Sequence, residues 1–117
     1  MSDDADVASV ARVVADAFGI TVADLQSKRR DSRVTTPRQI AYLLAHDGLG
    51  ISLPRIGAYF GGRDHTTILH GVRRARDVHV QAFAAECEEA IFVLRLRKFG
   101  TFLRQGAAVF QSVRGGS

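Results

Sequence analysis

The stretch GGRDHTTILH, residues 61–70, places side chains that could bind or react next to one another. An acid, a histidine and two hydroxyls suggest three kinds of chemistry: metal binding, nucleophilic catalysis, or hydrogen bonding to base edges. Two glycines before these residues and an apolar run after them indicate that they stand at the start of a helix. Their spacing then decides among the three.

The spacing disfavours a metal site. His65 and His70 are five residues apart, about 140° around a helix, so they cannot share an ion as residues four apart can. A His-Asp dipeptide at 46–47 has no further ligands at metal-binding spacing. We therefore expect no metal.

The spacing also disfavours catalysis. Thr66 and Thr67 have an acid and a histidine as sequence neighbours, but neighbours on a helix point in different directions. The glycines are not followed by the Lys-Ser or Lys-Thr of a phosphate loop. We expect no enzymatic activity and no cofactor.

The same side chains suit a base pair in DNA. Asp64 can accept a hydrogen bond from cytosine, the methyl groups of Thr66 and Thr67 can meet a thymine methyl, and His65 can bond a base edge. A helix N-terminus also attracts phosphate through its free amides and its dipole. Because the helical angle of His65 lies nearer the apolar side, a histidine packed in the core is the alternative.

A short helix and a glycine turn precede these residues. Ser52 is a helix cap for SLPRIGAYF, with Pro54 in the first turn, and Gly61 and Gly62 form a tight turn. Asp64 then caps a second amphipathic helix. The apolar face of that helix comprises Ile68, Leu69, Val72 and Ala75, and the opposite face comprises Thr66, Thr67, His70, Arg73, Arg74 and Asp77. This is the helix-turn-helix pattern, in which the second helix reads DNA.

Helical signals continue on both sides. Apolar residues at Val7, Val10, Val14 and Phe18 predict a first helix that ends at Gly19. The sequence TVAD, residues 21–24, resembles a capping box that starts a short helix, and residues 27–35 read as a basic loop. Thr36 is the predicted N-cap of the next helix, with Pro37 at its first position and Gln39 closing the box. A last helical stripe comprises Phe83, Cys87, Ala90, Ile91 and Leu94. No segment alternates like a strand, so the predicted fold is all-α.

Composition sets the outer bounds. With 117 residues, 46% hydrophobic and 24% charged, the chain suits one globular domain. The single Cys87 excludes an internal disulfide and fits a reducing compartment. No apolar run reaches the length of a membrane span, and the N-terminus is acidic where a secretory signal is basic. We expect a cytoplasmic protein without a membrane partner.

Charge is distributed unevenly along the chain. Residues 1–24 carry five acids and one base, residues 25–80 carry ten bases and four acids, and residues 81–117 carry five bases and three acids. A basic middle attracts polyanions, of which nucleic acid is the commonest in the cytoplasm. The alternative is a solvated, arginine-rich face.

These motifs together resemble a known family. The stretches SKRR, PRQIAYLL, SLPRIGAYF and GGRDHTTILHG, in this order and spacing, are similar to the C-terminal DNA-binding domain of the bacterial replication initiator DnaA. The resemblance covers roughly residues 5–85. It implies a DnaA-type helix-turn-helix domain over residues 1–94, a helical extension over residues 95–117, and recognition of a short asymmetric DnaA box in duplex DNA.

The resemblance also implies roles for individual residues. Arg30 would enter the minor groove, Asp64, His65, Thr66 and Thr67 would read bases in the adjacent major groove, and Pro54 would meet a thymine methyl. The implied phosphate contacts are Lys28, Arg38, Gln39, Thr67 and Arg73. Phosphate contacts make binding salt-dependent, whereas base contacts discriminate among sequences.

Two positions and one missing motif depart from the family. Asp31 and Thr36 stand where the family usually has a neutral polar residue and an arginine, so the loop is less basic and weaker binding is expected. No phosphate loop is present. We therefore expect a stand-alone DNA-reading domain without ATPase activity, which competes with or modulates the initiator.

The C-terminal segment leaves two alternatives open. Its apolar stripe comprises Phe99, Phe102, Leu103, Phe110 and Val113, interrupted by Gly100 and Gly106. This stripe either packs on its own domain or forms a surface for a protein partner or self-association through residues 99–113. Self-association would suit a dimeric transcription regulator at other operators, and an interaction module with an incidental basic face is a third class.

Overall fold

The computed structural model describes residues 3–96, and every regular element in this range is helical. In chain order the elements are α1 (Asp3–Phe18), α2 (Val22–Gln26), α3 (Ser32–Leu43), η1 (Leu44–Gly48), α4 (Leu53–Tyr59), α5 (His65–Arg74), η2 (Ala75–His79), α6 (Val80–Ala82) and α7 (Ala84–Leu96), where η marks a π-helical turn. The predicted all-α class is confirmed. The apolar stripe predicted over residues 99–113 lies outside the described residues.

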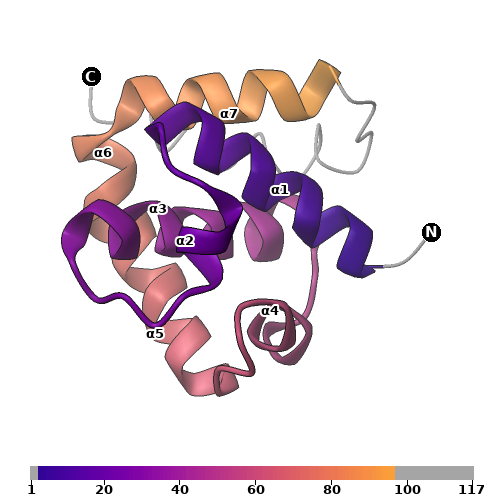
Figure 1. Cartoon of the computed structure of the whole chain (residues 1–117). Helices are drawn as coiled ribbons and strands as arrows, with labels where there is room; N and C mark the ends of the chain where they lie inside the picture. The colour runs from indigo at the N-terminus through magenta and orange to yellow at the C-terminus, as the bar shows by residue number, and fades with distance from the viewer. Residues whose placement is uncertain (1–2, 97–117) are drawn as a thin grey trace.

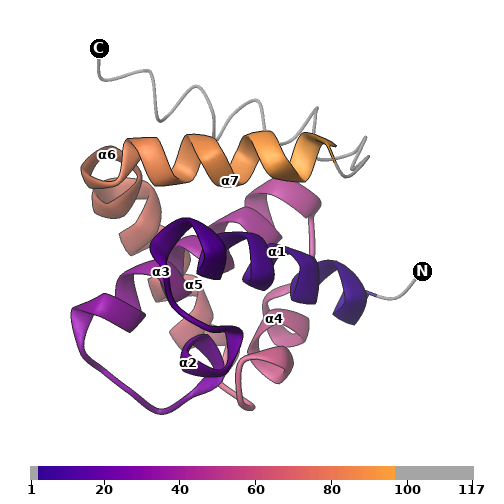
Figure 2. The ribbon, with the colours of Figure 1, turned by 45° about the horizontal axis from the view of Figure 1, so that its top comes forward.

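Helices α1 and α7 lie side by side across one end of the molecule, and α4 and α5 lie at the other end (Figure 1). Figure 2 shows the same arrangement with α3 passing between these two layers. The predicted stripe of α1 is buried at Val7, Val10 and Val14. Gly19 then ends the helix with a φ of 68°, a value that glycine adopts without steric cost.

A capping box starts α2, as predicted. Thr21 Oγ1 accepts a hydrogen bond from the Asp24 amide at 3.0 Å, and Asp24 Oδ2 accepts one from the Thr21 amide at 3.1 Å. These two bonds satisfy amides that the first turn leaves free. They also lower the pKa of the Asp24 carboxyl. The capping box fixes the chain just before the basic loop.

The predicted start of α3 is wrong. The helix begins at Ser32 with Asp31 as N-cap, so Thr36 and Pro37 lie inside it and the loop shortens to residues 27–31. Thr35 contributes to this earlier start, because its hydroxyl donates to the Asp31 carbonyl at 2.7 Å. Thr36 and Pro37 are buried. Their packing in the protein interior outweighs the preference of proline for the first helical position.

The helix-turn-helix unit comprises α4, residues 60–64 and α5. Ser52 caps α4 by accepting a hydrogen bond from the Arg55 amide, as predicted. Gly61 and Gly62 turn the chain with φ values of 86° and 75°. On α5, Ile68 and Val72 enter the core, whereas Leu69 is only half-buried. The predicted helix-turn-helix is confirmed, and its turn has five residues, 60–64.

The last helices close the core from the other side. Cys87, Ala90, Ile91 and Leu94 of α7 are buried, as their spacing predicts. Burial raises the pKa of the Cys87 thiol to about 12, so it stays protonated and unreactive. Within residues 3–96, the helices are too short or too polar to cross a membrane.

Candidate nucleic-acid interface

The N-terminal end of α5 is open to solvent. Asp64 is the N-cap, and its carboxylate accepts a hydrogen bond from the Thr66 amide at 3.2 Å. Thr66 and Thr67 are exposed, and the side chain of His65 is 64% exposed. The alternative of a packed histidine is therefore excluded. Four polar side chains stand together at the helix end that a helix-turn-helix protein inserts into the major groove.

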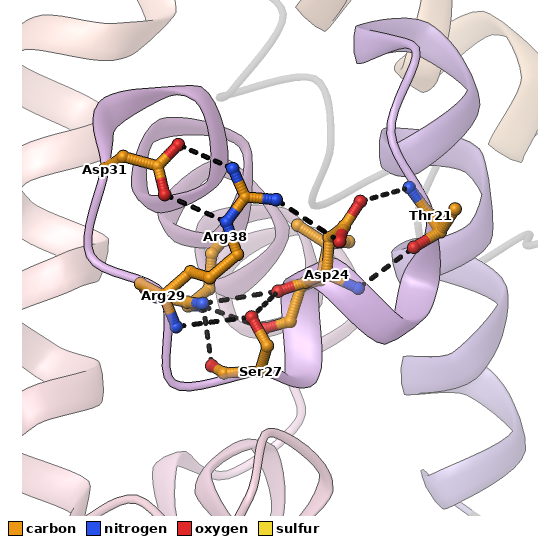
Figure 3. Close-up of polar contacts among 7 residues, drawn as sticks. Thr21, Asp24, Ser27, Arg29, Asp31 and Arg38 are labelled. Atoms are coloured by element: carbon orange, nitrogen blue, oxygen red, sulfur yellow. Dashed lines mark hydrogen bonds and ion pairs between the residues drawn. The ribbon is translucent and has the colours of Figure 1, made fainter.

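The basic loop, residues 27–31, lies beside α5 and presents Lys28 and Arg30 to solvent. Its backbone is held by the side chain of Arg38 of α3 (Figure 3). Arg38 Nε donates to the Leu25 carbonyl at 2.8 Å, and its terminal nitrogens donate to the carbonyls of Arg29 at 2.9 Å and Ser27 at 2.8 Å. Because these carbonyls turn inward, the side chains of Lys28 and Arg30 are left on the solvent side of the loop.

This position of Arg38 conflicts with the predicted phosphate contact. The residue is only 4% exposed, and its guanidinium donors are used on backbone carbonyls. Burial, and then the nearby charge of Arg63, lower its pKa. The PRQ motif alone could not reveal this role, because the partner carbonyls come from an earlier segment of the chain. Arg38 organises the loop from inside.

Among the basic side chains of the loop, Arg29 forms ion pairs with nearby carboxylates. Its Nε and one terminal nitrogen lie 3.0 and 2.9 Å from the two carboxylate oxygens of Asp31, and its other terminal nitrogen lies 3.4 Å from Asp24 (Figure 3). The hydrogen bond from Arg29 lowers the pKa of the Asp31 carboxyl. The departure at position 31 thus offsets one positive charge of the loop.

A groove separates the basic loop from α5. It has a volume of about 650 Å³ and is lined by Arg30, Ser32, Thr35, Thr36, Gln39, Thr67, His70, Gly71, Arg74 and His79. A second groove, of about 590 Å³, adjoins it at Arg30, Thr35 and Thr67 and continues along Lys28 and Arg63. The two grooves are lined by hydroxyl groups and basic side chains, a composition that suits binding of a phosphate backbone.

Two groove residues were not predicted from the sequence. His70 and Arg74 follow Thr67 at steps of three and four, so all three side chains share one face of α5. The sequence pattern places both on the polar face of α5 but predicts no role for them. The polar-face pattern was the available signal, but only the position of the loop shows that this face borders a groove.

The remaining predicted contacts are placed differently. Gln39 lines the first groove, and its Oε1 accepts a hydrogen bond from His79 Nε2 at 2.8 Å. Pro54 and Arg73 are exposed but line neither groove. Their DNA contacts stay predictions.

The structure gives His46 and Asp47 roles in packing. His46 Nδ1 lies 2.8 Å from the Ile51 carbonyl, and Asp47 pairs with Arg76 at 2.6 Å, which joins η1 to η2. Within residues 3–96, no three His, Cys, Asp or Glu side chains gather closely enough to hold a metal ion.

Comparison with known proteins agrees with this geometry. A family model described as the bacterial dnaA protein helix-turn-helix matches residues 7–75. The chromosomal replication initiator protein DnaA of Bordetella pertussis is 47% identical over 88 residues, which are 75% of this chain and 18% of that protein. The same protein of Herminiimonas arsenicoxydans is 47% identical over 89 residues, 75% of this chain and 19% of that one. That of Paraburkholderia phymatum is 51% identical over 71 residues, 61% and 14% of the two chains.

The chain therefore spans less than a fifth of the length of these relatives. The matched range runs from α1 to the start of η2 and contains the basic loop, the turn and α5. A helix-turn-helix of this kind is a DNA-binding module and not a catalytic one. The chain belongs to the family of bacterial DnaA helix-turn-helix domains.

Proposed function

We propose that this protein recognises DnaA-box-like sequences in duplex DNA by reading two adjacent grooves at once. Arg30 enters the minor groove, and Asp64, His65, Thr66 and Thr67 read base edges in the major groove, with Pro54 against a thymine methyl. The observation that carries this proposal is that the exposed end of α5 and the exposed Arg30 stand on opposite sides of one polar groove. In duplex DNA, a single phosphate backbone separates a minor groove from the next major groove. In the proposed complex, this backbone lies in the polar groove of the protein, between Arg30 and α5.

Most of the phosphate contacts come from the walls of the two polar grooves, and Arg73 contributes one from outside them. Lys28, Gln39, Thr67 and Arg73 keep their predicted roles, and His70 and Arg74 join them because they face the same space as Thr67. Arg38 acts through the loop that it holds. Basic side chains along the groove walls make the affinity for DNA fall as the salt concentration rises. The side chains that contact base pairs, Arg30 and those at the start of α5, set the sequence preference.

Binding-site selection from random duplexes at physiological salt tests this proposal. The selected DNA should contain one asymmetric motif. It should have an A·T-rich segment, contacted by Arg30 in the minor groove, next to base pairs that α5 reads by hydrogen bonds in the major groove. Affinity without any base preference would overturn it.

We propose further that the protein modulates replication initiation by occupying boxes that the initiator also uses. Two reading heads cannot share one set of base edges, so binding is mutually exclusive. Footprinting of a single box with increasing amounts of this protein and a fixed amount of DnaA should show replacement of one footprint by the other. Simultaneous undisturbed occupancy would contradict the competition.

A second candidate is a dimeric regulator acting on other operators. It is favoured by Phe92 and Leu96 of α7, whose side chains are exposed at 61% and 66% and carry the apolar pattern toward the chain's end. A two-fold dimer imposes palindromic half-sites. The same selection experiment distinguishes the two candidates by the symmetry of the motif.

A further inference from the structure

The carbonyl of Ser27, at the start of the basic loop, receives two guanidinium groups. Arg38 of α3 donates to it at 2.8 Å, and Arg63 of the helix-turn-helix turn donates to it at 2.7 Å. Arg63 stands immediately before Asp64, the N-cap of α5. One backbone oxygen therefore joins the minor-groove loop both to α3 and to the segment that leads into the recognition helix.

Arg63 is itself fixed at several points. Its amide donates to the Gly57 carbonyl at 2.9 Å, and its side chain also donates to the Phe60 carbonyl. A second tie lies beside it, where Gln26 Nε2 donates to the Tyr59 carbonyl at 3.0 Å. Arg63 thus joins the turn to the loop, and Gln26 joins the end of α2 to the end of α4 next to them.

The arrangement has an electrostatic cost. Arg38 and Arg63 approach the same oxygen, and the charge of Arg63 adds to burial in lowering the pKa of Arg38, because like charges repel. Neutral donors could tie the same backbone segments without this repulsion. Two guanidinium groups beneath a loop that presents Lys28 and Arg30 add to the positive field along the second groove.

We infer that Arg63 is a positioning residue that fixes the distance between Arg30 and the reading end of α5. This inference depends on the proposed two-groove function. A loop held in place before binding loses less conformational entropy when Arg30 enters the minor groove. A guanidinium suits this role because its planar fork can donate to two carbonyls in fixed directions, which an ammonium group cannot do as well.

A double-mutant cycle on the selected duplex tests the inference. Kd is measured for the parent, Arg63→Ala, Arg30→Ala and the double variant. If Arg63 acts through Arg30, then Arg63→Ala weakens binding by about tenfold and adds little once Arg30 is absent. Multiplicative losses would overturn the inference.

Base preference provides the second readout. Arg63→Ala should relax discrimination between A·T and G·C at the pairs that Arg30→Ala relaxes, and leave the preference read by α5 unchanged. Arg63→Lys should relax it as well, because it keeps the charge but loses the fork. Full retention of the preference in Arg63→Lys would show that only charge matters, against the inference.

Three controls complete the experiment. Arg12→Ala removes one charge from an exposed position on α1, away from both grooves, and should leave the preference intact. Gln26→Ala breaks the second tie and should change the preference in the same direction, which keeps the test available if Arg63→Ala does not fold. An Arg30→Ala variant with parental Kd and preference would contradict the minor-groove function itself, whereas a normal loss in Arg30→Ala with an independent loss in Arg63→Ala would contradict only the positioning role.

Discussion

His79 Nε2 lies 2.8 Å from Gln39 Oε1, so the π-helical turn η2 is hydrogen-bonded to α3 in the wall of the groove between the basic loop and α5. An amide oxygen only accepts, which makes His79 the donor and leaves the amide nitrogen of Gln39 for another partner. In the proposed complex, that partner is a phosphate oxygen. His79 thereby holds the Gln39 carboxamide in the orientation that suits an anion.

This pair gives the first prediction. His79→Ala should weaken binding by about fivefold, close to one hydrogen bond, on all duplexes alike, and Gln39→Ala should do the same. The double variant should be little worse than either single one. Filter binding at several salt concentrations measures this, with exposed Gln81→Ala as the control. Losses that depend on the base sequence would contradict it.

His79 also predicts a pH dependence of stability. Burial, and then the charge of Arg74, lower its pKa from the ordinary 6.5. As pH falls through that value, the unfolded chain binds a proton before the folded chain does, so the free energy of unfolding decreases. Thermal unfolding from about pH 7.5 to about pH 5.5 should therefore show a falling Tm, and a smaller fall in His79→Gln. Equal falls in both proteins would exclude His79 as the cause.

Gly71 predicts a packing defect. A Cβ on this residue would lie 2.7 and 3.0 Å from two ring carbons of Tyr42 and 3.2 Å from Gln39 Cγ. Tyr42 is buried and cannot move aside freely, so Gly71→Ala should cost about 1–3 kcal/mol of unfolding free energy despite the better helix propensity of alanine. Urea denaturation measures this. His70→Ala, at the exposed neighbouring position, should change stability by less than about 0.5 kcal/mol.

Asp31 predicts a gain of affinity. Asp31→Asn removes the carboxylate that pairs with Arg29 and adds one net positive charge to the loop. Affinity for duplex DNA should rise on every sequence, and the salt dependence should steepen by about 0.9 if Arg29 then meets a phosphate. Asp16→Asn on α1 changes the net charge equally, away from the loop, and should alter neither quantity appreciably. Weaker binding by Asp31→Asn would instead mean that the pair orders the loop for binding.

The exposed end of α5 predicts base discrimination. His65→Ala and Thr66→Ala should each cost about 1–3 kcal/mol on the selected site and relax the preference at one base pair. Arg74→Ala, which removes a charge from the groove wall, should weaken all duplexes alike. Competition titrations with single-base-pair variants of the site measure both effects. Uniform losses in all three variants would remove the assignment of α5 as the reading element.

Local signals in the sequence predicted most of the helix boundaries. The mutual bonds of Thr21 and Asp24, the cap at Ser52 and the positive φ angles of Gly61 and Gly62 involve only residues a few positions apart. Such interactions form in the same way wherever the segment is placed. The all-α class and the helix-turn-helix followed from them, as did the polar end of α5.

The errors arose where distant residues decide. Thr36 has the residue type of an N-cap and precedes a proline, yet α3 starts at Ser32, and Thr36 and Pro37 are buried inside the helix. Arg38 has the residue type of a phosphate ligand, yet its partners are carbonyls from 9 to 14 positions earlier in the chain. Neither burial nor a partner that distant is visible in the local pattern.

The sequence by itself determined which side chains have hydrogen-bonding or charged groups on the polar side of α5, because side-chain chemistry and helical periodicity are local properties. Only the tertiary structure decided which of them share one groove and which basic residues are held inside. The ties from Arg38 and Arg63 to one carbonyl, and from His79 to Gln39, cross between elements. Their geometry depends on how the helices pack, and packing is a property of the whole chain.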